Sequence, residues 1–371
     1  TTLYHLIFIV KIKIIMKVCI LGEGLTSLTL AKALINQGIY VDIFSNQKFK
    51  QKQKSRTLGI SKSNIKFFNE NILNIEKLLW NIEKIEIYSE SLNNEKVLNF
   101  KNNNQRLFSI IKNYKLYDLL FSSLIKNKYF KFKNKFVLKN YGLVINCDSN
   151  NSITKKFFFR KFDKEYDSYA HTTLIEHKYL NNNHIASQIF TKKGPLAFLP
   201  ISSKETSVVY SVHNSNNKKK DENIKKLIKD KNFKYTIKSV GKINSFELKS
   251  INLRSYYHNN ILAFGDLLHK IHPLAGQGFN MTIRDIKILL EIIKKRIDFG
   301  LSLDSSVNSE FQKKLKHKNF IFSNGVDLIH EFFNIERKMN TNLLSKSVKQ
   351  ISNYPIINKM FTKIADRGIL F

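Results

Sequence analysis

A glycine-rich turn near the N-terminus has the spacing of a phosphate-binding loop. Gly22, Gly24 and Ser27 form the pattern G-x-G-x-x-S between an apolar run, residues 17–21, and a stretch of helical periodicity that ends at Gly38. Gly22 allows a tight turn, Gly24 removes the Cβ that would keep a pyrophosphate from the backbone, and the third position requires a small residue. The free N–H groups at the helix start would bind the pyrophosphate. The turn predicts a dinucleotide site, although a glycine turn that only packs has the same spacing.

A second glycine-bearing segment, residues 265–280, reads GDLLHKIHPLAGQGFN after an apolar strand-like run. Asp266 offers a carboxylate to the hydroxyl groups of a sugar or ribityl chain. Pro273 would stiffen the loop, and Gly276 and Gly278 would let backbone amides approach a planar ligand. The following helix would point its positive end at that ligand and stabilise a ring that becomes anionic on reduction.

These residues, with Asp285, resemble the motif G-D-x-x-H-x-x-x-P-x-A-G-Q-G-x-N-x-x-x-x-D of the FAD-dependent aromatic-ring monooxygenases. The form HPLAGQG is similar to that of their ubiquinone-biosynthesis hydroxylase branch, which acts on polyprenylated phenols. Four more segments resemble family elements, and the resemblance covers about residues 16–297. The segments are 56–60 (RTLGI), 148–152 (DSNNS), 194–200 (GPLAFLP) and 246–248 (FEL).

The resemblance implies FAD as cofactor, with NAD(P)H as reductant and O2 and a polyprenylated phenol as substrates. Oxygen would add at flavin C4a, and the resulting hydroperoxide would pass one oxygen atom to the ring. No side chain is assigned as acid or base, since the cofactor carries the difficult chemistry. The residues implied to bind FAD are Gly22, Gly24, Ser27, Arg56, Gly265, Asp266, Pro273, Gly276, Gln277, Gly278 and Asn280. Those implied to face the substrate are Gly194, Pro195, Leu196, Ala197 and Phe198.

Several positions depart from the family pattern, mostly in the adenosine half of the site. Serine replaces the third glycine at Ser27, the ribose-binding acid at Ser45 and a glycine at Ser149, and Thr282 replaces a small residue. Asp42 lies three residues too early to bind the ribose. We therefore expect FAD to bind, but more loosely than in the family.

The predicted fold class is α/β: a discontinuous Rossmann-like FAD domain, an inserted mixed or antiparallel β-sheet substrate domain, and a helical C-terminal tail. Residues 1–15 are interpreted as a leader or over-extended start, since their apolar run is too short to cross a bilayer. The predicted FAD-domain segments are 16–80, 106–158 and 251–300. The predicted substrate-domain segments are 81–105 and 159–250, and the helical C-terminal region is 301–371.

The composition limits the partners. The net charge is +33, from 54 lysines and eight arginines against 29 acidic residues. So small a share of arginine argues against a dedicated nucleic-acid reader. Peripheral contact with an anionic membrane surface and contact with other ubiquinone-biosynthesis enzymes remain open. The apolar spacing of the tail segment 356–364 favours docking on the core over contact with membrane. The aromatic run 157–159 favours core or hinge packing over a substrate platform.

The cysteines and histidines argue against a metal site. Cys19 and Cys147 are too few for a disulfide framework or a four-ligand zinc site, and they indicate a reduced, intracellular protein. His269 and His272 have no acidic or cysteine cluster beside them. We expect His269 to bond backbone and His272 to face the cofactor. The predicted location is cytoplasmic, peripheral on the inner membrane surface.

Two other functions stay open. A flavin-dependent reductase of isoprenoid double bonds shares the architecture, although the HPLAGQG form argues against it. Alternatively, the serines at positions 27, 45 and 149 signal a decayed cofactor site in a non-enzymatic basic protein that binds membrane or nucleic acid.

Overall fold

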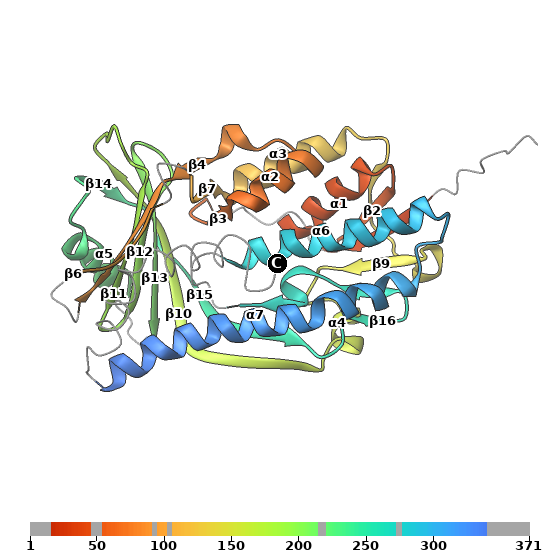
Figure 1. Ribbon diagram of the computed structural model, residues 1–371. Helices are drawn as coiled ribbons and strands as arrows, with labels where there is room; N and C mark the ends of the chain where they lie inside the picture. The colour runs from red at the N-terminus through yellow and green to blue at the C-terminus, as the bar shows by residue number, and fades with distance from the viewer. Residues whose placement is uncertain are drawn as a thin grey trace, which may run out of the picture.

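The computed structural model describes residues 16–45, 54–90, 95–101, 106–213, 220–271 and 277–339. Within these residues two large sheets lie toward opposite ends of an elongated molecule, and helices pack around and between them (Figure 1). The predicted segments 1–15 and 356–364 lie outside the described residues.

The first sheet has six strands in the order β16-β17-β9-β1-β2-β8, all parallel except the β16–β17 pair. Its strands are β1 (Lys17–Leu21), β2 (Tyr40–Phe44), β8 (Phe130–Lys133), β9 (Leu143–Asn146), β16 (Tyr257–His258) and β17 (Ile261–Ala263). Continuous apolar runs suit β1, β9 and β17, because parallel strands are buried on both faces.

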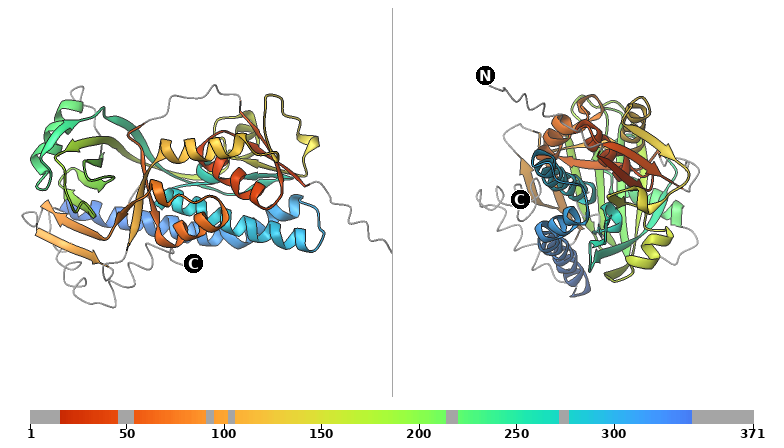
Figure 2. Two further views of the ribbon diagram at one scale, coloured as in Figure 1. Left: turned by 90° about the horizontal axis from the view of Figure 1, so that it is seen from above. Right: turned by 90° about the vertical axis from the view of Figure 1, so that its right-hand side faces the viewer.

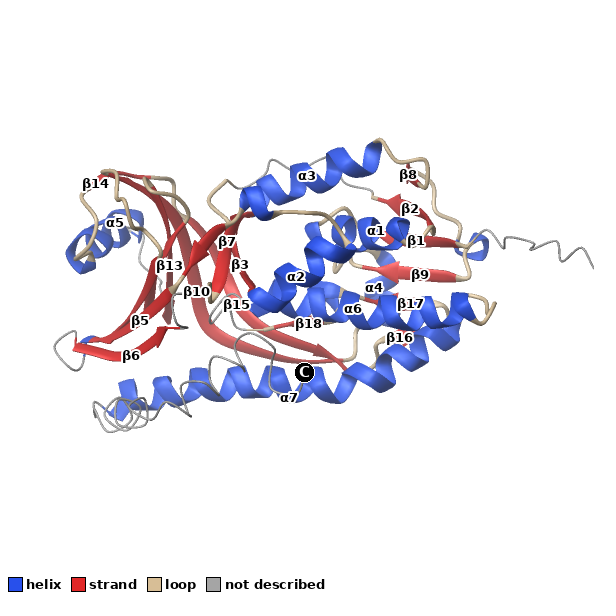
Figure 3. Ribbon diagram, turned by 45° about the horizontal axis from the view of Figure 1, so that its top comes forward, coloured by secondary structure: helices blue, strands red, loops and turns tan. Residues whose placement is uncertain are grey.

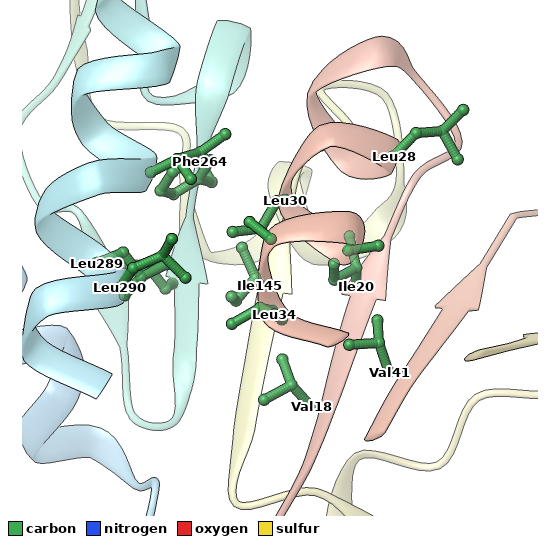
Figure 4. Packing of buried hydrophobic residues seen from close by; sticks show 14 of the residues in the cluster. Val18, Ile20, Leu28, Leu30, Leu34, Val41, Ile145, Phe264, Leu289 and Leu290 are labelled. Atoms are coloured by element: carbon green, nitrogen blue, oxygen red, sulfur yellow. The ribbon is translucent and has the colours of Figure 1, made fainter. Parts of the chain in front are cut away.

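Helices complete the core of this sheet. The helix α1 (Leu25–Asn36) packs on it between α3 (Asn113–Ile125) and α6 (Gln277–Asp298). Figure 4 shows the packing of side chains from α1, α6 and the strands. The labelled residues are Val18, Ile20, Leu28, Leu30, Leu34, Val41, Ile145, Phe264, Leu289 and Leu290, all at most 4% exposed.

The second sheet has nine strands in the order β18-β15-β10-β13-β12-β11-β5-β6, with β14 also paired to β10. Its pairs are antiparallel except β5 with β11. The strands are β5 (Lys84–Ser89), β6 (Glu95–Lys101), β10 (Lys161–His177), β11 (Ile185–Thr191), β12 (Gly194–Pro200), β13 (Glu205–His213), β14 (Ile237–Val240), β15 (Asn244–Leu253) and β18 (His269–Lys270). The helix α5 (Lys220–Lys231) covers the face turned away from the first sheet (Figure 1).

A small three-stranded sheet, ordered β3-β7-β4, lies between the two large sheets. Its strands are β3 (Thr57–Ser61), β4 (Trp80–Ile82) and β7 (Phe108–Lys112), and α2 (Lys62–Asn71) follows β3 directly. Short helices are α4 (Ser152–Phe157) and the 3-10 turns Glu76–Leu78, Leu138–Asn140 and Gly265–Leu267. The long helix α7 (Ser305–Met339) runs beside α6 (Figure 2) and below both large sheets (Figure 3). None of the described helices is long and apolar enough to span a membrane.

The predicted fold class is confirmed: an α/β unit with parallel strands, a largely antiparallel second sheet and helices in the C-terminal region. The apolar run 17–21 forms the strand β1 with those bounds. The FKFK run of β8 has no clear strand pattern, because β8 lies at the edge of the sheet with half of its side chains exposed. The predicted domain boundaries stay predictions.

A carboxylate is buried within the first sheet. Asp42 on β2 is 2% exposed and accepts a hydrogen bond from the Tyr141 hydroxyl at 2.5 Å. The ammonium groups of Lys17 and Lys133 lie 2.9 and 3.4 Å from the same oxygen. Burial by itself would raise the pKa of Asp42, but these hydrogen bonds and charges hold it below its ordinary value. Asp42 on β2 therefore binds side chains from β1, from β8 and from Tyr141, and it is not free to bind a ribose.

We predict that Asp42→Asn lowers the free energy of unfolding by ~2 kcal/mol, since it removes charged hydrogen bonds from a buried site. Because the pKa of Asp42 is lowered in the folded state, the variant should lose the full stabilisation above about pH 4. The difference in unfolding free energy between wild type and variant should shrink as the pH falls further. Urea unfolding at several pH values measures it.

The matched control is Asp163→Asn, which breaks an exposed ion pair with Lys161 and should leave the unfolding curve unchanged. A difference between wild type and Asp42→Asn that does not change with pH would contradict the assignment of a charged carboxylate.

Candidate functional site

The two glycine motifs meet at the carboxyl end of the parallel strands, although about 240 residues separate them in the sequence. Neighbouring strand ends are joined by hydrogen bonds from Cys147 N to Leu21 O and from Phe264 N to Asn146 O, both 2.9 Å. A Cβ placed on Gly265 would lie 2.6 Å from the Thr26 methyl carbon of α1. The loops after β1, β9 and β17 thus form one surface, at the sheet edge where open α/β sheets bind ligands.

Backbone conformation explains two of these glycines. Gly22 has φ +104°, and a Cβ there would lie 3.2 Å from the Cβ of Asp148. Gly265 has φ +65° and is closely packed on Thr26. Both positions need glycine, because a side chain would be strained as well as crowded. The two glycines let three loops approach closely enough to form a single surface.

The start of α1 has the properties of a pyrophosphate site. Its N-cap is Gly24, no side chain caps it, and its first turn holds no acidic residue. The first backbone bond into the helix is donated by Leu28, so the preceding N–H groups make no helical hydrogen bond. A Cβ built on Gly24 would meet no atom within 4 Å. Open space in front of free N–H groups fits a dinucleotide phosphate.

Ser27 occupies the third glycine position without blocking the turn. Its side chain is fully buried beside Cys147. Burial raises the pKa of the Cys147 thiol to about 12, and the nearby carboxylates of Asp266 and Asp148 add to the effect. Ser27 therefore contributes to packing between helix and strand. Its side chain does not enter the open space at Gly24.

The start of α6 is fastened to β3 by Asn280. The Asn280 side chain accepts hydrogen bonds from Ser61 N at 3.0 Å and Asn64 Nδ2 at 2.9 Å, and donates to Gly59 O at 2.9 Å. Asn280, predicted to frame the flavin ring, therefore directs its amide to the strand. Its contribution to the site is to position α6.

The loop predicted to hold the flavin ring, residues 265–280, is here called the flavin-ring loop, and the structure describes only part of it. Gly278 lies in the first turn of α6, where an added Cβ would meet nothing within 4 Å. The first turn holds no acidic residue that would neutralise the positive end of the helix. His272, Pro273 and Gly276 lie outside the described residues, and so does the side chain of Gln277. Their predicted roles remain predictions.

Arg56 and Asp266 are the charged residues predicted to hold the middle of FAD. Both side chains are exposed. Arg56 directly precedes β3, and its carbonyl accepts a hydrogen bond from Asn113 N at 3.0 Å. Asp266 follows Gly265 on the surface formed by the joined loops. Their binding roles stay predictions.

The sequence led us to expect that the His269 ring hydrogen bonds backbone, but it hydrogen bonds a side chain instead. Its Nε2 hydrogen bonds the carboxylate of Asp285 on α6, and both side chains are buried. Asn319 of α7 donates to the other oxygen of Asp285 at 3.3 Å. These bonds link β18, α6 and α7, so His269 holds the beginning and the end of the flavin-ring loop together.

The predicted substrate strand β12 divides between two environments. Leu196 and Phe198 are buried with α5 on the outer face of the sheet. Gly194 ends a turn where its N–H contacts Thr191. Pro195 and Ala197 alternate with the buried pair. They lie on the face of Leu199, which packs with residues of the three-stranded sheet. Leu196 and Phe198 therefore point away from the three-stranded sheet, because successive strand side chains point to opposite faces, and their predicted contact with a substrate stays a prediction.

Sequence reasoning missed the other residues of that inner face. Strand register places Thr172 and Val209 beside Ala197. Ser207 on the same face hydrogen bonds Thr57 of β3 at 2.9 Å. The alternation of side chains along β10 and β13 indicates that every second residue lies on the same face. Only the pairing of β10, β13 and β12 shows which of the two sets of residues faces inward.

Comparison with solved structures defines the class of fold. The chain superposes on *Klebsiella pneumoniae* HpxO complexed with FAD and uric acid, with a TM-score of 0.73 and 13% identity, covering 94% of this chain and 97% of that one. For the p-nitrophenol 4-monooxygenase PnpA from *Pseudomonas putida* the TM-score is 0.76 at 11% identity, covering 95% and 98%. The fold is that of the FAD-dependent monooxygenases.

Sequence comparison then gives the family. Residues 141–347 match the squalene epoxidase family model, and the chain belongs to that family. It is 30% identical over 155 residues to the 3-demethoxyubiquinol 3-hydroxylase of *Escherichia coli*, covering 39% of each chain. It is 24% identical over 261 residues to the mitochondrial ubiquinone biosynthesis monooxygenase COQ6 of *Drosophila melanogaster*, covering 60% of this chain and 55% of that one. The chain thus matches about two fifths to just over half the length of these curated relatives.

We predict that Gly24→Ala weakens FAD binding at least about tenfold while changing the free energy of unfolding by no more than about 1 kcal/mol. The backbone at Gly24, with φ −69° and ψ 174°, suits any residue, and the added methyl group enters space reserved for phosphate. Gly265→Ala should instead destabilise the apoprotein by ~2 kcal/mol, because its Cβ meets Thr26 at positive φ.

Flavin fluorescence titration and urea unfolding measure the two effects. Gly300→Asn serves as control, since Gly300 has φ +67°, which asparagine tolerates, and open space around it. Unchanged FAD affinity in Gly24→Ala would contradict the pyrophosphate site.

Proposed function

We propose that this protein is an FAD-dependent monooxygenase that hydroxylates the aromatic ring of a polyprenylated phenol in ubiquinone biosynthesis. The observation that carries the proposal is the contact of Gly265 with Thr26, which joins the Gly22–Ser27 turn and the Gly265–Asn280 segment at one sheet edge. The ubiquinone-biosynthesis hydroxylases among the relatives support the choice of substrate.

The N–H groups at the start of α1 would hold the FAD pyrophosphate, and Gly24 would give it room. Asp266 would accept hydrogen bonds from ribityl hydroxyls, and Arg56 would lie beside the flavin's middle section. When bound, the flavin supplies the redox chemistry that activates O2. The start of α6 would stabilise negative charge on the ring, while Asn280 fixes that helix against β3.

The inner face of the second sheet would receive the phenol. Pro195, Ala197 and Val209 present apolar groups there, and Thr172 presents a hydroxyl. These apolar groups would exclude water from the reaction when the flavin is bound, as a hydroxylation of this kind requires. NAD(P)H is the proposed reductant. The prenyl tail of the proposed substrate favours a protein that works peripherally at the cytoplasmic side of a membrane.

Epoxidation of an isoprenoid double bond is a second candidate, and the family that matches the chain favours it. The same flavin chemistry serves both reactions, because each inserts one atom from O2 into an electron-rich substrate. Which of the two occurs is decided by the group that the inner face of the second sheet presents to the flavin.

We predict that purified, FAD-loaded protein incorporates one atom of ¹⁸O from ¹⁸O2 into the ring of a polyprenylated phenol, with NAD(P)H oxidised in parallel. Mass spectrometry of the product identifies the position and the source of the oxygen. Protein loaded with FAD and assayed without NAD(P)H is the control and should give no labelled product.

Label in the prenyl chain would favour epoxidation. A product that gains two hydrogens and no oxygen would favour the isoprenoid reductase. Protein that binds no FAD would favour the decayed cofactor site.

A further inference from the structure

An exposed cluster of phenylalanine and basic side chains lies where the first part of β10 runs beside α7. Phe159, Phe162 and Phe320 are 61%, 52% and 46% exposed. The guanidinium carbon of Arg254 lies 4.5 Å from the centre of the Phe162 ring, and that of Arg160 lies 5.7 Å from the Phe159 ring. The Phe162 and Phe320 rings are 6.3 Å apart. We call these five residues together with Lys316 the aromatic–basic patch.

The patch is built on a rigid base. Asn252 on β15, paired in register with Phe162, accepts a hydrogen bond from Ser323 of α7 at 3.2 Å. Further along the same face of β10, the Tyr166 hydroxyl hydrogen bonds Asp327 of α7. These contacts fix the helix on the strands, so the exposed rings keep their relative positions. Figure 3 shows α7 following this edge of the molecule.

Basic side chains outnumber acidic ones in the surroundings of the patch. Residues 152–165, 249–257 and 305–325 hold eleven lysines and arginines and three acidic residues, and four more acids, Asp167, Glu247, Asp304 and Asp327, lie within two residues of these segments. Those three acids, Asp163, Glu165 and Glu310, are each paired with a lysine. Lys313, Lys316 and His317 are exposed one and two turns before Phe320 on α7. The surface therefore carries a positive field around a group of apolar rings.

We propose that the aromatic–basic patch docks the protein onto a bilayer surface that contains anionic phospholipid. Phenylalanines can insert between headgroups, and each nearby lysine or arginine gains from the negative surface potential. Single-stranded nucleic acid fits less well, because bases stack on free ring faces, and guanidinium groups lie over the faces of Phe159 and Phe162. This proposal depends on the surface alone and stands whether or not the hydroxylation is correct.

The test is vesicle sedimentation with the full chain, comparing phosphatidylcholine vesicles with phosphatidylcholine–phosphatidylglycerol vesicles. We expect binding at least about tenfold tighter to the anionic vesicles, falling as salt is raised. The double variant Phe162→Ala, Phe320→Ala should lose about tenfold of that affinity. Arg254→Gln with Lys316→Gln should lose about fivefold for each charge.

Phe233→Ala is the matched control, since Phe233 is 60% exposed beyond α5, away from the patch, and its loss should leave vesicle binding unchanged. FAD content and thermal unfolding, measured on every variant, separate lost docking from lost folding. Equal binding to neutral and anionic vesicles, or undiminished binding by the patch variants, would overturn the proposal. Binding to a single-stranded oligonucleotide that is tighter than vesicle binding and is lost in the same variants would assign the patch to nucleic acid instead.

Discussion

The arrangement of the candidate site depends on the close packing of Gly265 against Thr26. It can form only because Gly265 has no Cβ and adopts positive φ, and because β17, β9 and β1 are adjacent and parallel. Parallel neighbours end at the same edge, so loops from distant parts of the sequence must meet there. This contact brings the start of α1 and the 3-10 turn Gly265–Leu267 to the same edge of the sheet.

The remaining polar contacts position the second motif. Asn280 fastens the start of α6 to β3, and His269 bonds Asp285 farther along the same helix. The inner face of the nine-stranded sheet is held to β3 by the Thr57–Ser207 hydrogen bond. The strand β3 thus contacts both α6 and the inner face of the nine-stranded sheet.

Local patterns in the sequence predicted the first βαβ unit, because strand periodicity, the glycine turn and Gly38 after the helix all act within 30 residues. Roles that depend on distant partners could not be predicted. Asn280 bonds residues about 220 positions away, and the burial of Leu196 and Phe198 depends on which face α5 covers. The structural role of Asp42 likewise depends on Tyr141, which lies about 100 positions away, and on the Lys17 ammonium group.

Hydrogen–deuterium exchange of the full chain with and without FAD tests the central claim most directly, since it reports on both motifs at once. The account predicts that FAD slows amide exchange simultaneously in the segment that contains Gly24 and in the segments on either side of the Gly265–Asn280 loop. Protection of only one motif, or of neither, would contradict a single flavin site built from both.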